Sequence, residues 1–232
     1  MTIFWYALRR GLTRPVSLAL NSILPITFIS VANSEAFGTG PEARGYFFVS
    51  YVILFGAFMM AGSIQADRID GVLTRILAGP ITFRNYLMQN FFAGLAPMVV
   101  LSAILGVIGI LRHGWDLPFA GLVVLTYIML SATSIGLSFV WSCFFKDREA
   151  STVAFSLILT LMAFLGGMLI PLSMMPATIR HIGALFPAHW AARAFEELIA
   201  YEGATAQYWT SILALALFSA ALILYGSKRR IV

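Results

Sequence analysis

Long apolar runs alternate with short polar stretches along the whole of this 232-residue chain. Each run has about the ~20 residues that a helix needs to cross a hydrocarbon layer of ~30 Å. The runs are continuously apolar without a period of two, which predicts helices and not the strands of a barrel. The pattern therefore predicts an all-α membrane protein, with one transmembrane domain over residues 1–232 and six transmembrane helices. The six spans are predicted at residues 16–32, 46–64, 86–111, 117–145, 151–170 and 208–226.

The composition supports this assignment, because 60% of the residues are hydrophobic and only 11% are charged. A soluble domain of this length could not bury so much apolar surface, so the composition excludes one. The formal net charge of +5 does not indicate nucleic-acid binding, since the basic residues are dispersed beside the apolar runs. Anionic headgroups and membrane insertion favour basic residues at such positions. We therefore expect membrane lipid, and no nucleic acid, as a partner.

The distribution of basic residues predicts the orientation of the helices. Six spans place both termini on one side, where eleven of the 15 Lys and Arg residues would lie. These are Arg9, Arg10, Arg14, Arg68, Arg75, Arg84, Lys146, Arg148, Lys228, Arg229 and Arg230. Cytoplasmic loops retain basic residues during insertion, so both termini are predicted to be cytoplasmic.

Residues 1–15 predict a short helix that lies on the cytoplasmic leaflet. Aromatic and aliphatic side chains are mixed there with the basic pair Arg9 and Arg10, and Pro15 halts the helix at the first span. Amphipathic stretches of this kind bind at the depth of the lipid headgroups. A basic, aromatic-rich anchor without any partner would have the same composition, so both interpretations stay open.

A second amphipathic helix is predicted at residues 66–79, between the second and third spans. Its apolar side chains have the spacing of one helical face: Ile69, Val72, Leu73, Ile76 and Leu77. Polar or charged side chains fill the remaining positions: Asp67, Arg68, Asp70, Thr74 and Arg75. Gly79 and Pro80 end the helix. The apolar face would pack on the spans and the charged face would meet something in the cytoplasm; a helix that merely lies on the membrane surface is the alternative.

Residues 171–205 are too numerous for a turn and too apolar for a solvated loop. Pro171, Pro176 and Pro187 divide them into pieces that look helical. Short external helices, dipping into the outer half of the bilayer or resting on it, would use this composition. We therefore expect re-entrant or interfacial helices before the last span.

One of these helices would carry four polar side chains on a single face: His189, Arg193, Glu196 and Glu197. Their spacing of i, i+4 and i+7 or i+8 brings them together near the outer membrane surface. An interfacial salt-bridge network is the favoured explanation of this face. An outer gate or a substrate contact is the alternative.

Three stretches resemble type-2 ATP-binding-cassette (ABC) transporter permeases, the membrane subunits of exporters for drugs, antibiotics, lipids or polysaccharides. The amphipathic amino-terminal helix resembles the connecting helix of that family. The run DRIDGVLTRILAGPITFRNYL resembles the segment between its second and third spans. The run GGMLIPLSMMPATIRHIGALFPAHWAARAFEEL resembles its signature of glycine, apolar residues and spaced prolines before an aromatic helix. In that run Phe186 stands where an asparagine commonly precedes the last proline.

The resemblance implies that the helix at residues 66–79 is a coupling helix, which docks in a groove of an ATPase subunit. The residues implied in ATPase coupling are Asp67, Arg68, Asp70, Gly71, Thr74, Arg75 and Leu77. The implied partners are two copies of a cytoplasmic ABC ATPase, which bind ATP and Mg, and a second permease of the same or a related chain. The resemblance further implies export of an amphipathic, lipid-like, drug or glycan substrate across a bacterial or archaeal cytoplasmic membrane.

The chain lacks the residues for ATP hydrolysis. A P-loop needs Gly-Lys-Ser/Thr, whereas Lys146 follows Phe145 and Lys228 follows Ser227. The three histidines are too few and too scattered to predict a metal site, so we expect a transport subunit with no cofactor of its own. The alternative is a non-transporting membrane protein, such as an intramembrane enzyme or an assembly factor. A paired acid or a Ser/His set inside the spans would mark that alternative.

Overall fold

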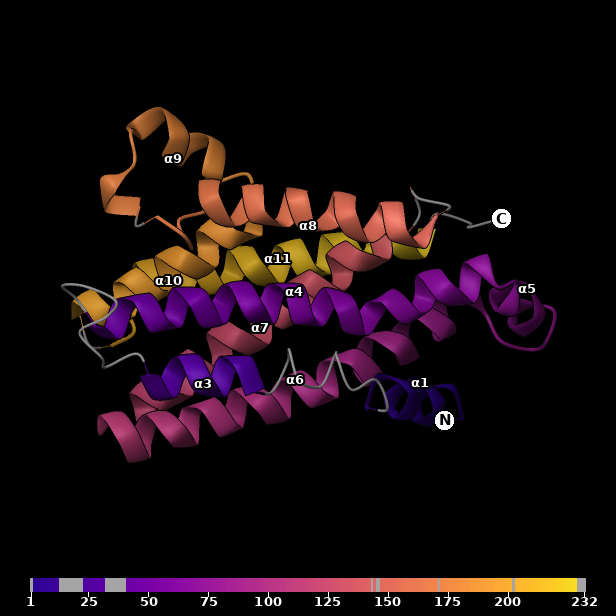
Figure 1. Ribbon diagram of the computed structural model, residues 1–232, viewed down its shortest axis with the longest axis horizontal. Coiled ribbons are helices and arrows are strands. Elements are labelled where there is room, and N and C mark those ends of the chain that lie inside the picture. Colours follow the sequence, from indigo (N-terminus) through magenta and orange to yellow (C-terminus); the bar gives the residue numbers. More distant parts are fainter. Residues whose placement is uncertain are drawn as a thin grey trace.

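The computed structural model describes residues 2–12, 23–31, 41–142, 144, 147–170, 172–201 and 203–228. Within these ranges every regular element is a helix (Figure 1). In chain order the elements are α1 (Thr2–Leu12), α3 (Leu24–Val31), α4 (Pro41–Ile69), α5 (Val72–Leu77), α6 (Phe83–His113), α7 (Leu117–Trp141), α8 (Arg148–Leu165), the 3-10 turn η3 (Leu172–Met174), α9 (Ala177–Gly183), α10 (Pro187–Tyr201) and α11 (Ala206–Lys228).

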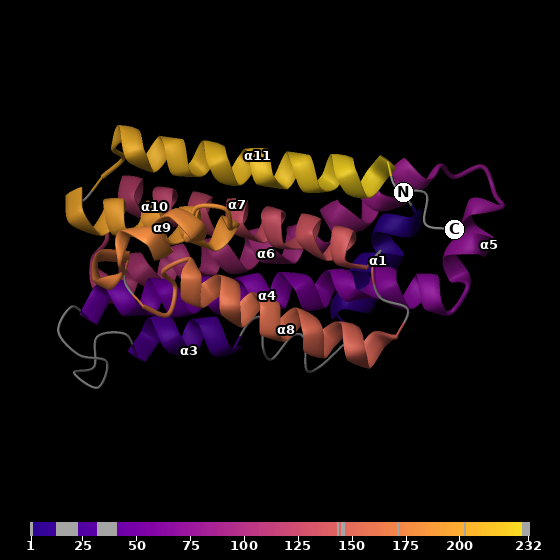
Figure 2. The same cartoon turned by 90° about the horizontal axis from the view of Figure 1, so that it is seen from above.

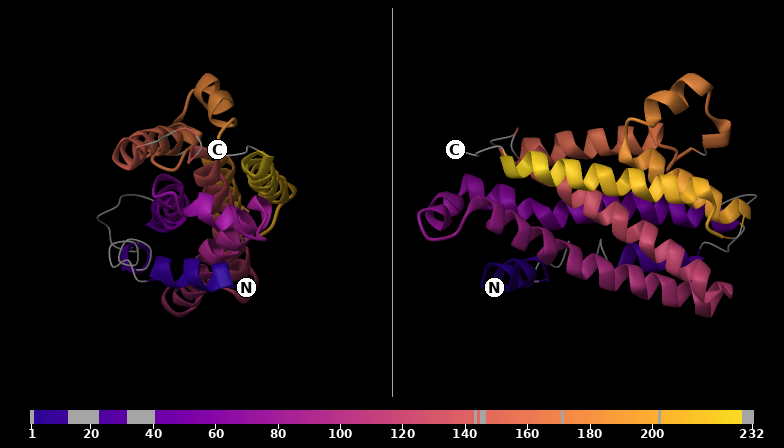
Figure 3. Two further views of the ribbon diagram at one scale, coloured as in Figure 1. Left: turned by 90° about the vertical axis from the view of Figure 1, so that its right-hand side faces the viewer. Right: turned by 180° about the vertical axis from the view of Figure 1, so that it is seen from behind.

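The long helices α4, α6, α7, α8 and α11 run side by side along the longest axis of the molecule (Figures 1 and 2). The amino-terminal helix α1, the short helix α5 and the last turns of α11 lie at one end of this bundle (Figure 3). The helices α9 and α10 and the start of α11 lie at the other end (Figure 3). We refer to these as the α5 end and the α9 end.

Helix α7 forms the centre of the bundle, where it packs against α4, α6, α10 and α11. Small residues permit this close packing: a Cβ added at Gly136 would lie 3.1 Å from the Cβ of Leu222 in α11. Buried hydroxyls also join the helices, because Thr133 Oγ1 donates to the carbonyl of Leu215 at 3.1 Å and Ser134 donates to the carbonyl of Leu54. The core is therefore mainly apolar, and these two buried hydroxyls have hydrogen-bond partners.

Three of the described helices are long and apolar enough to cross a membrane: α6, α7 and α11. Shorter apolar stretches occupy Phe47–Ala57 within α4 and Glu149–Leu165, which is most of α8. On α6, α8 and α11, large apolar side chains such as Val100, Leu157 and Leu217 are exposed on the outside, as lipid-facing residues would be. The prediction of an all-α, multi-pass membrane protein is confirmed. Of the predicted first span, α3 covers the last part, and residues 16–22 lie outside the described ranges.

The predicted fifth span is shorter than expected, because α8 ends at Leu165 and the chain turns at Gly166 and Gly167. Gly167 has a φ of 92°, which is accessible to glycine at little cost. A Cβ at Gly167 would also lie 2.5 Å from the side chain of Leu172.

The amino terminus of α8 is capped by Asp147, whose Oδ2 accepts a hydrogen bond from the backbone N–H of Ala150 at 3.0 Å. We expect Asp147→Ala to lower the free energy of unfolding by about 1 kcal/mol, because it leaves this helix end uncapped. Glu149→Ala is the matched control, since Glu149 is exposed in the same turn and makes no cap. Unfolding of both variants in mixed micelles checks this, and equal stabilities would contradict it.

Candidate functional site

A buried carboxylate at the α5 end joins three helices that are distant in sequence. Asp67, near the end of α4, is only 6% exposed. Its two oxygens accept hydrogen bonds from both terminal nitrogens of Arg10 in α1, at 2.5 and 3.1 Å. The hydroxyl of Tyr86 in α6 donates to Asp67 Oδ2 at 2.6 Å. A two-pronged guanidinium–carboxylate pair fixes direction as well as distance, so α1 is held to α4 and α6 at a defined angle.

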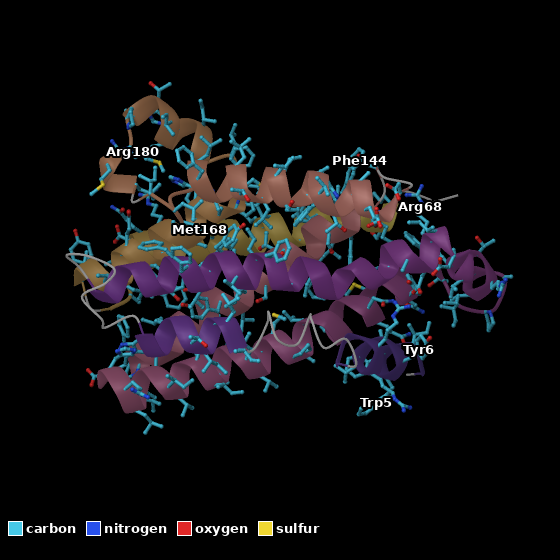
Figure 4. The ribbon with its side chains drawn as sticks, in the orientation of Figure 1. Trp5, Tyr6, Arg68, Phe144, Met168 and Arg180 are labelled. Atoms are coloured by element: carbon cyan, nitrogen blue, oxygen red, sulfur yellow. The ribbon has the colours of Figure 1, made fainter. Side chains whose placement is uncertain are left out.

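Further contacts hold α1 along the start of α6. The backbone N–H of Phe4 donates to Gln89 Oε1 at 3.2 Å, and Ile3 packs on the apolar core. Trp5 and Tyr6 are 65% and 67% exposed, and Figure 4 shows Trp5 on the side of α1 that is turned away from the bundle. Helix α1 therefore has one face on the bundle and an aromatic face turned outward, where headgroups would lie.

The connection between α7 and α8 is tied to the end of α4. Arg68 donates to the carbonyl of Ser142 at 2.6 Å, and Figure 4 shows Arg68 at the same end of the molecule as Phe144. Gln65 accepts a hydrogen bond from Ser151 of α8 at 3.0 Å. The last two turns of α4 thus contact α1, α6 and the start of α8, which makes them the junction of the α5 end.

The helix expected at residues 66–79 is two helices in the structure. Helix α4 continues to Ile69, Gly71 adopts a left-handed conformation with a φ of 70°, and α5 covers only Val72–Leu77. Leu73 of α5 is buried and faces the core, as expected. Ile69 is 44% exposed, so its expected place on the buried face is wrong.

This break divides the predicted coupling residues into two groups. Asp67 and Arg68 belong to α4 and are held by Tyr86, Arg10 and the carbonyl of Ser142, so they do not form the expected charged outer face. Asp70, Thr74 and Arg75 are exposed on or beside α5, while Gly71 and Leu77 are half-buried beneath them. The outward polar surface of α5, which we define as Asp70, Thr74 and Arg75, is smaller than predicted.

At the α9 end, α9, α10 and the start of α11 surround a pocket of ≈ 410 Å³. Its titratable lining residues are Arg180, His181, His189, Arg193, Glu196 and Glu197. The structure therefore brings together the four polar residues predicted on α10 and adds Arg180 and His181 from α9. Figure 4 shows Arg180 at this end of the molecule, on α9.

The salt-bridge network favoured for this face is not formed. Among the described residues the one ion pair is that of Arg10 with Asp67. In the pocket, Glu196 Oε1 accepts from the backbone N–H of Leu172 at 2.9 Å, and Glu197 Oε2 accepts from the hydroxyl of Thr205 at 2.7 Å. Arg193 of α10 donates a hydrogen bond to Gln207 Oε1 at 2.9 Å, and its guanidinium lies 5.9 Å from the ring centre of Trp190. Glu196, Glu197 and Arg193 are thus hydrogen-bonded to neutral partners.

Burial alters two titratable groups of the pocket. It raises the pKa of Glu196. The hydrogen bond from the Leu172 N–H opposes this rise, because it stabilises the carboxylate. Burial also lowers the pKa of His189, and the positive charges of Arg193 and Arg180 lower it further. His189 is therefore a neutral imidazole at pH 7.

Comparison with known protein families identifies the class of protein to which this chain belongs. A family described as ABC-2 family transporter protein matches residues 8–228, nearly the whole chain. The chain belongs to the ABC-2 transporter family. A search of curated proteins finds no match. This ABC-2 protein is therefore a membrane permease subunit of an ABC transporter, and permeases of this family in general work with a partner ATPase subunit. Membership of a transporter family favours this function over the non-transporting alternative.

Some residues at both ends of the ABC-2 protein were not singled out from the sequence. Arg10 was expected only as a basic residue of α1, and Tyr86 only as the start of a span. Gln207 of α11 lines the pocket and was not predicted there. Among the described residues, no three His, Cys, Asp or Glu side chains are placed to hold a metal ion.

Proposed function

We propose that the protein is the permease of an ABC exporter and that the outward polar surface of α5 receives the ATPase subunit. The observation that carries this proposal is the junction beneath α5. Asp70, Thr74 and Arg75 are exposed, whereas Leu73 anchors the helix in the core. A docking element needs an exposed recognition surface on a rigid support, and α5 has both.

The contacts of α4 supply a route for motion from α5 into the bundle. Displacement of α5 is passed to α4 through a short connection, because only Asp70 and Gly71 separate the two helices, and through their direct packing. From α4 the displacement reaches α1 and α6 through Asp67, and the start of α8 through Arg68 and Gln65. Rigid helices joined in this way move together when one is pushed.

The positions of the basic residues support a cytoplasmic α5 end. Arg9, Arg68, Arg75 and Arg84 are near this end, and α11 also ends there with Lys228. Basic residues are retained on the cytoplasmic side during insertion. We infer six spans with both termini in the cytoplasm of a bacterium or archaeon, the first span being formed by residues 16–32.

The proposed complex contains two permeases and two ATPase subunits, which bind ATP and Mg. A second permease, of the same or a related chain, would cover part of the apolar outer surface and complete the pathway. The described spans have few charged side chains in their apolar stretches, which favours an amphipathic, lipid-like, drug or glycan cargo over transport driven by protonated acids within the membrane.

The proposal is tested by isolating the full chain together with the ATPase subunit in mild detergent. We expect Arg75→Glu to weaken ATPase association by about tenfold, because a reversed charge meets a surface that is complementary to arginine. Transport-coupled ATPase activity should fall with it. Arg112→Glu is the matched control, since Arg112 is an exposed arginine at the other end of α6.

The two variants separate docking from general effects of charge. Retention of the ATPase by Arg112→Glu, with its loss from Arg75→Glu, is the expected result. If the unaltered chain brings down no ATPase, the exporter proposal fails. If Arg75→Glu retains both association and coupled activity, the ATPase docks elsewhere.

A further inference from the structure

The pocket at the α9 end contains two guanidinium groups that form no ion pair with a carboxylate in the part of the chain that the structure describes. Among the described residues, neither Arg180 nor Arg193 forms an ion pair, although Glu196 and Glu197 line the same pocket. The side chain of Arg193 donates to the neutral amide of Gln207, and no hydrogen bond is formed by the side chain of Arg180 in the described structure. Since a guanidinium carries five N–H donors, most of this donor capacity is free.

The two acids of the pocket are engaged by other donors. One oxygen of Glu196 accepts from the backbone N–H of Leu172, which comes from η3, and Glu197 accepts from the hydroxyl of Thr205 just before α11. These bonds connect α10 to its neighbours and give the acids a structural role. The two arginines have no equivalent role, because their one hydrogen bond in the described structure is that of Arg193 with Gln207.

A buried imidazole adds a further unmatched polar group to the same pocket. His189 is 6% exposed, lines the pocket, and its Nδ1 has no hydrogen-bond partner. A buried nitrogen without a partner costs free energy, so a structure retains one mainly where a ligand completes it. Gly183 of α9 lies directly beside this nitrogen, since a Cβ there would lie 3.4 Å from Nδ1.

We propose that this pocket binds the phosphate group of a ligand through Arg180, Arg193 and His189. The planar fork of arginine matches the oxygens of a phosphate, and in one tautomer the imidazole donates from Nδ1 to a third oxygen. The pocket is large enough for a phosphate with its attached group, at ≈ 410 Å³. Because water is excluded from the buried side of the pocket, these electrostatic contacts are stronger there than in water.

The phosphate has two chemical sources, a lipid headgroup or a free phosphate. Beside the pocket, Met174, Ile182 and Leu185 are exposed on η3, on α9 and just after it. Acyl chains would cover these side chains, so a lipid phosphate is expected to bind more tightly than orthophosphate. In an exporter the site would hold a phosphate-bearing cargo near its exit; that role rests on the proposed function, whereas phosphate binding itself does not.

Equilibrium dialysis of the full chain in a phosphate-free, uncharged detergent tests the site. Radiolabelled orthophosphate is the first probe, and dihexanoyl phosphatidic acid is the competitor with a lipid phosphate. Dihexanoylglycerol, which has the same chains without the phosphate, is the ligand control. We expect Arg193→Gln and Arg180→Gln each to weaken orthophosphate binding about tenfold or more, and Arg112→Gln, at the same end but outside the pocket, to leave it unchanged.

The outcomes are distinct. Saturable binding that the two pocket variants weaken supports the proposal. Stronger competition by phosphatidic acid than by unlabelled orthophosphate, without competition by dihexanoylglycerol, then assigns a lipid source, and equal or weaker competition assigns free phosphate. His189→Asn should also weaken binding while the chain still elutes as a single species. No saturable binding, or equal weakening by Arg112→Gln, overturns the site. A chain that binds phosphate but no ATPase would retain this site and lose only the exporter assignment.

Discussion

Replacing Asp67 by alanine is expected to lower the free energy of unfolding by about 3 kcal/mol. The change leaves the guanidinium of Arg10 and the hydroxyl of Tyr86 without their shared acceptor in a largely buried site. Removing one member of a buried ion pair typically costs ~3–5 kcal/mol, and the lower end applies because the Arg10 side chain is 20% exposed. Denaturation of the detergent-solubilised chain by increasing SDS measures this loss.

Asp70→Ala is the matched control for this prediction. Asp70 is an exposed acid three residues further along the chain, so its loss should change the stability by less than about 0.5 kcal/mol. Tyr86→Phe should have an intermediate effect of about 1 kcal/mol, since it removes one hydrogen bond and keeps the ion pair. If Asp67→Ala and Asp70→Ala are equally stable, the junction of α1, α4 and α6 does not depend on Asp67.

The second large effect is expected from Gly166→Ala, which should lower the free energy of unfolding by about 1–3 kcal/mol. A Cβ at Gly166 would lie 2.6 Å from the Cβ of Ala188 and 2.8 Å from the backbone nitrogen of His189. Because both are backbone-fixed atoms of α10, the helix itself must shift. The shift would displace His189 in the pocket, so orthophosphate binding should weaken together with the stability.

Gly121→Ala is the matched control for Gly166→Ala. Gly121 is an exposed glycine of α7, and a Cβ there would meet nothing within 4 Å. Alanine has the higher helix propensity, so this variant should be as stable as the unaltered chain or slightly more stable. A Gly166→Ala protein that matches Gly121→Ala in stability and in orthophosphate binding would contradict the close packing of α8 on α10.

Much of the helical architecture could be predicted from the sequence, because a long apolar run has few alternatives to a helix in a membrane. The predicted spans at residues 86–111 and 208–226 lie inside α6 and α11. The division at Gly71 could not be predicted from the hydrophobic period, since the period continues through it. A glycine in a left-handed conformation breaks the helix while the apolar spacing on either side is preserved.

The candidate sites could be predicted only in part, because their decisive partners are distant in the chain. Asp67 was expected to be outside, and its burial depends on Arg10 and Tyr86, which are 57 and 19 residues away. On α10 the helical spacing correctly placed the charged residues together. It could not show that the Leu172 N–H and the Thr205 hydroxyl would donate hydrogen bonds to Glu196 and Glu197, since these donors come from other elements.

The ion pair of Arg10 with Asp67 also has a consequence for the order of assembly. Arg10 leaves the ribosome long before its acceptor, and Tyr86, the third member, follows later still. Helix α1 therefore cannot reach its final place until α4 and the start of α6 have been synthesised and inserted. During this interval the amino-terminal segment is held only by lipid, and the folding of the first part of the chain is completed by residues that are made after it.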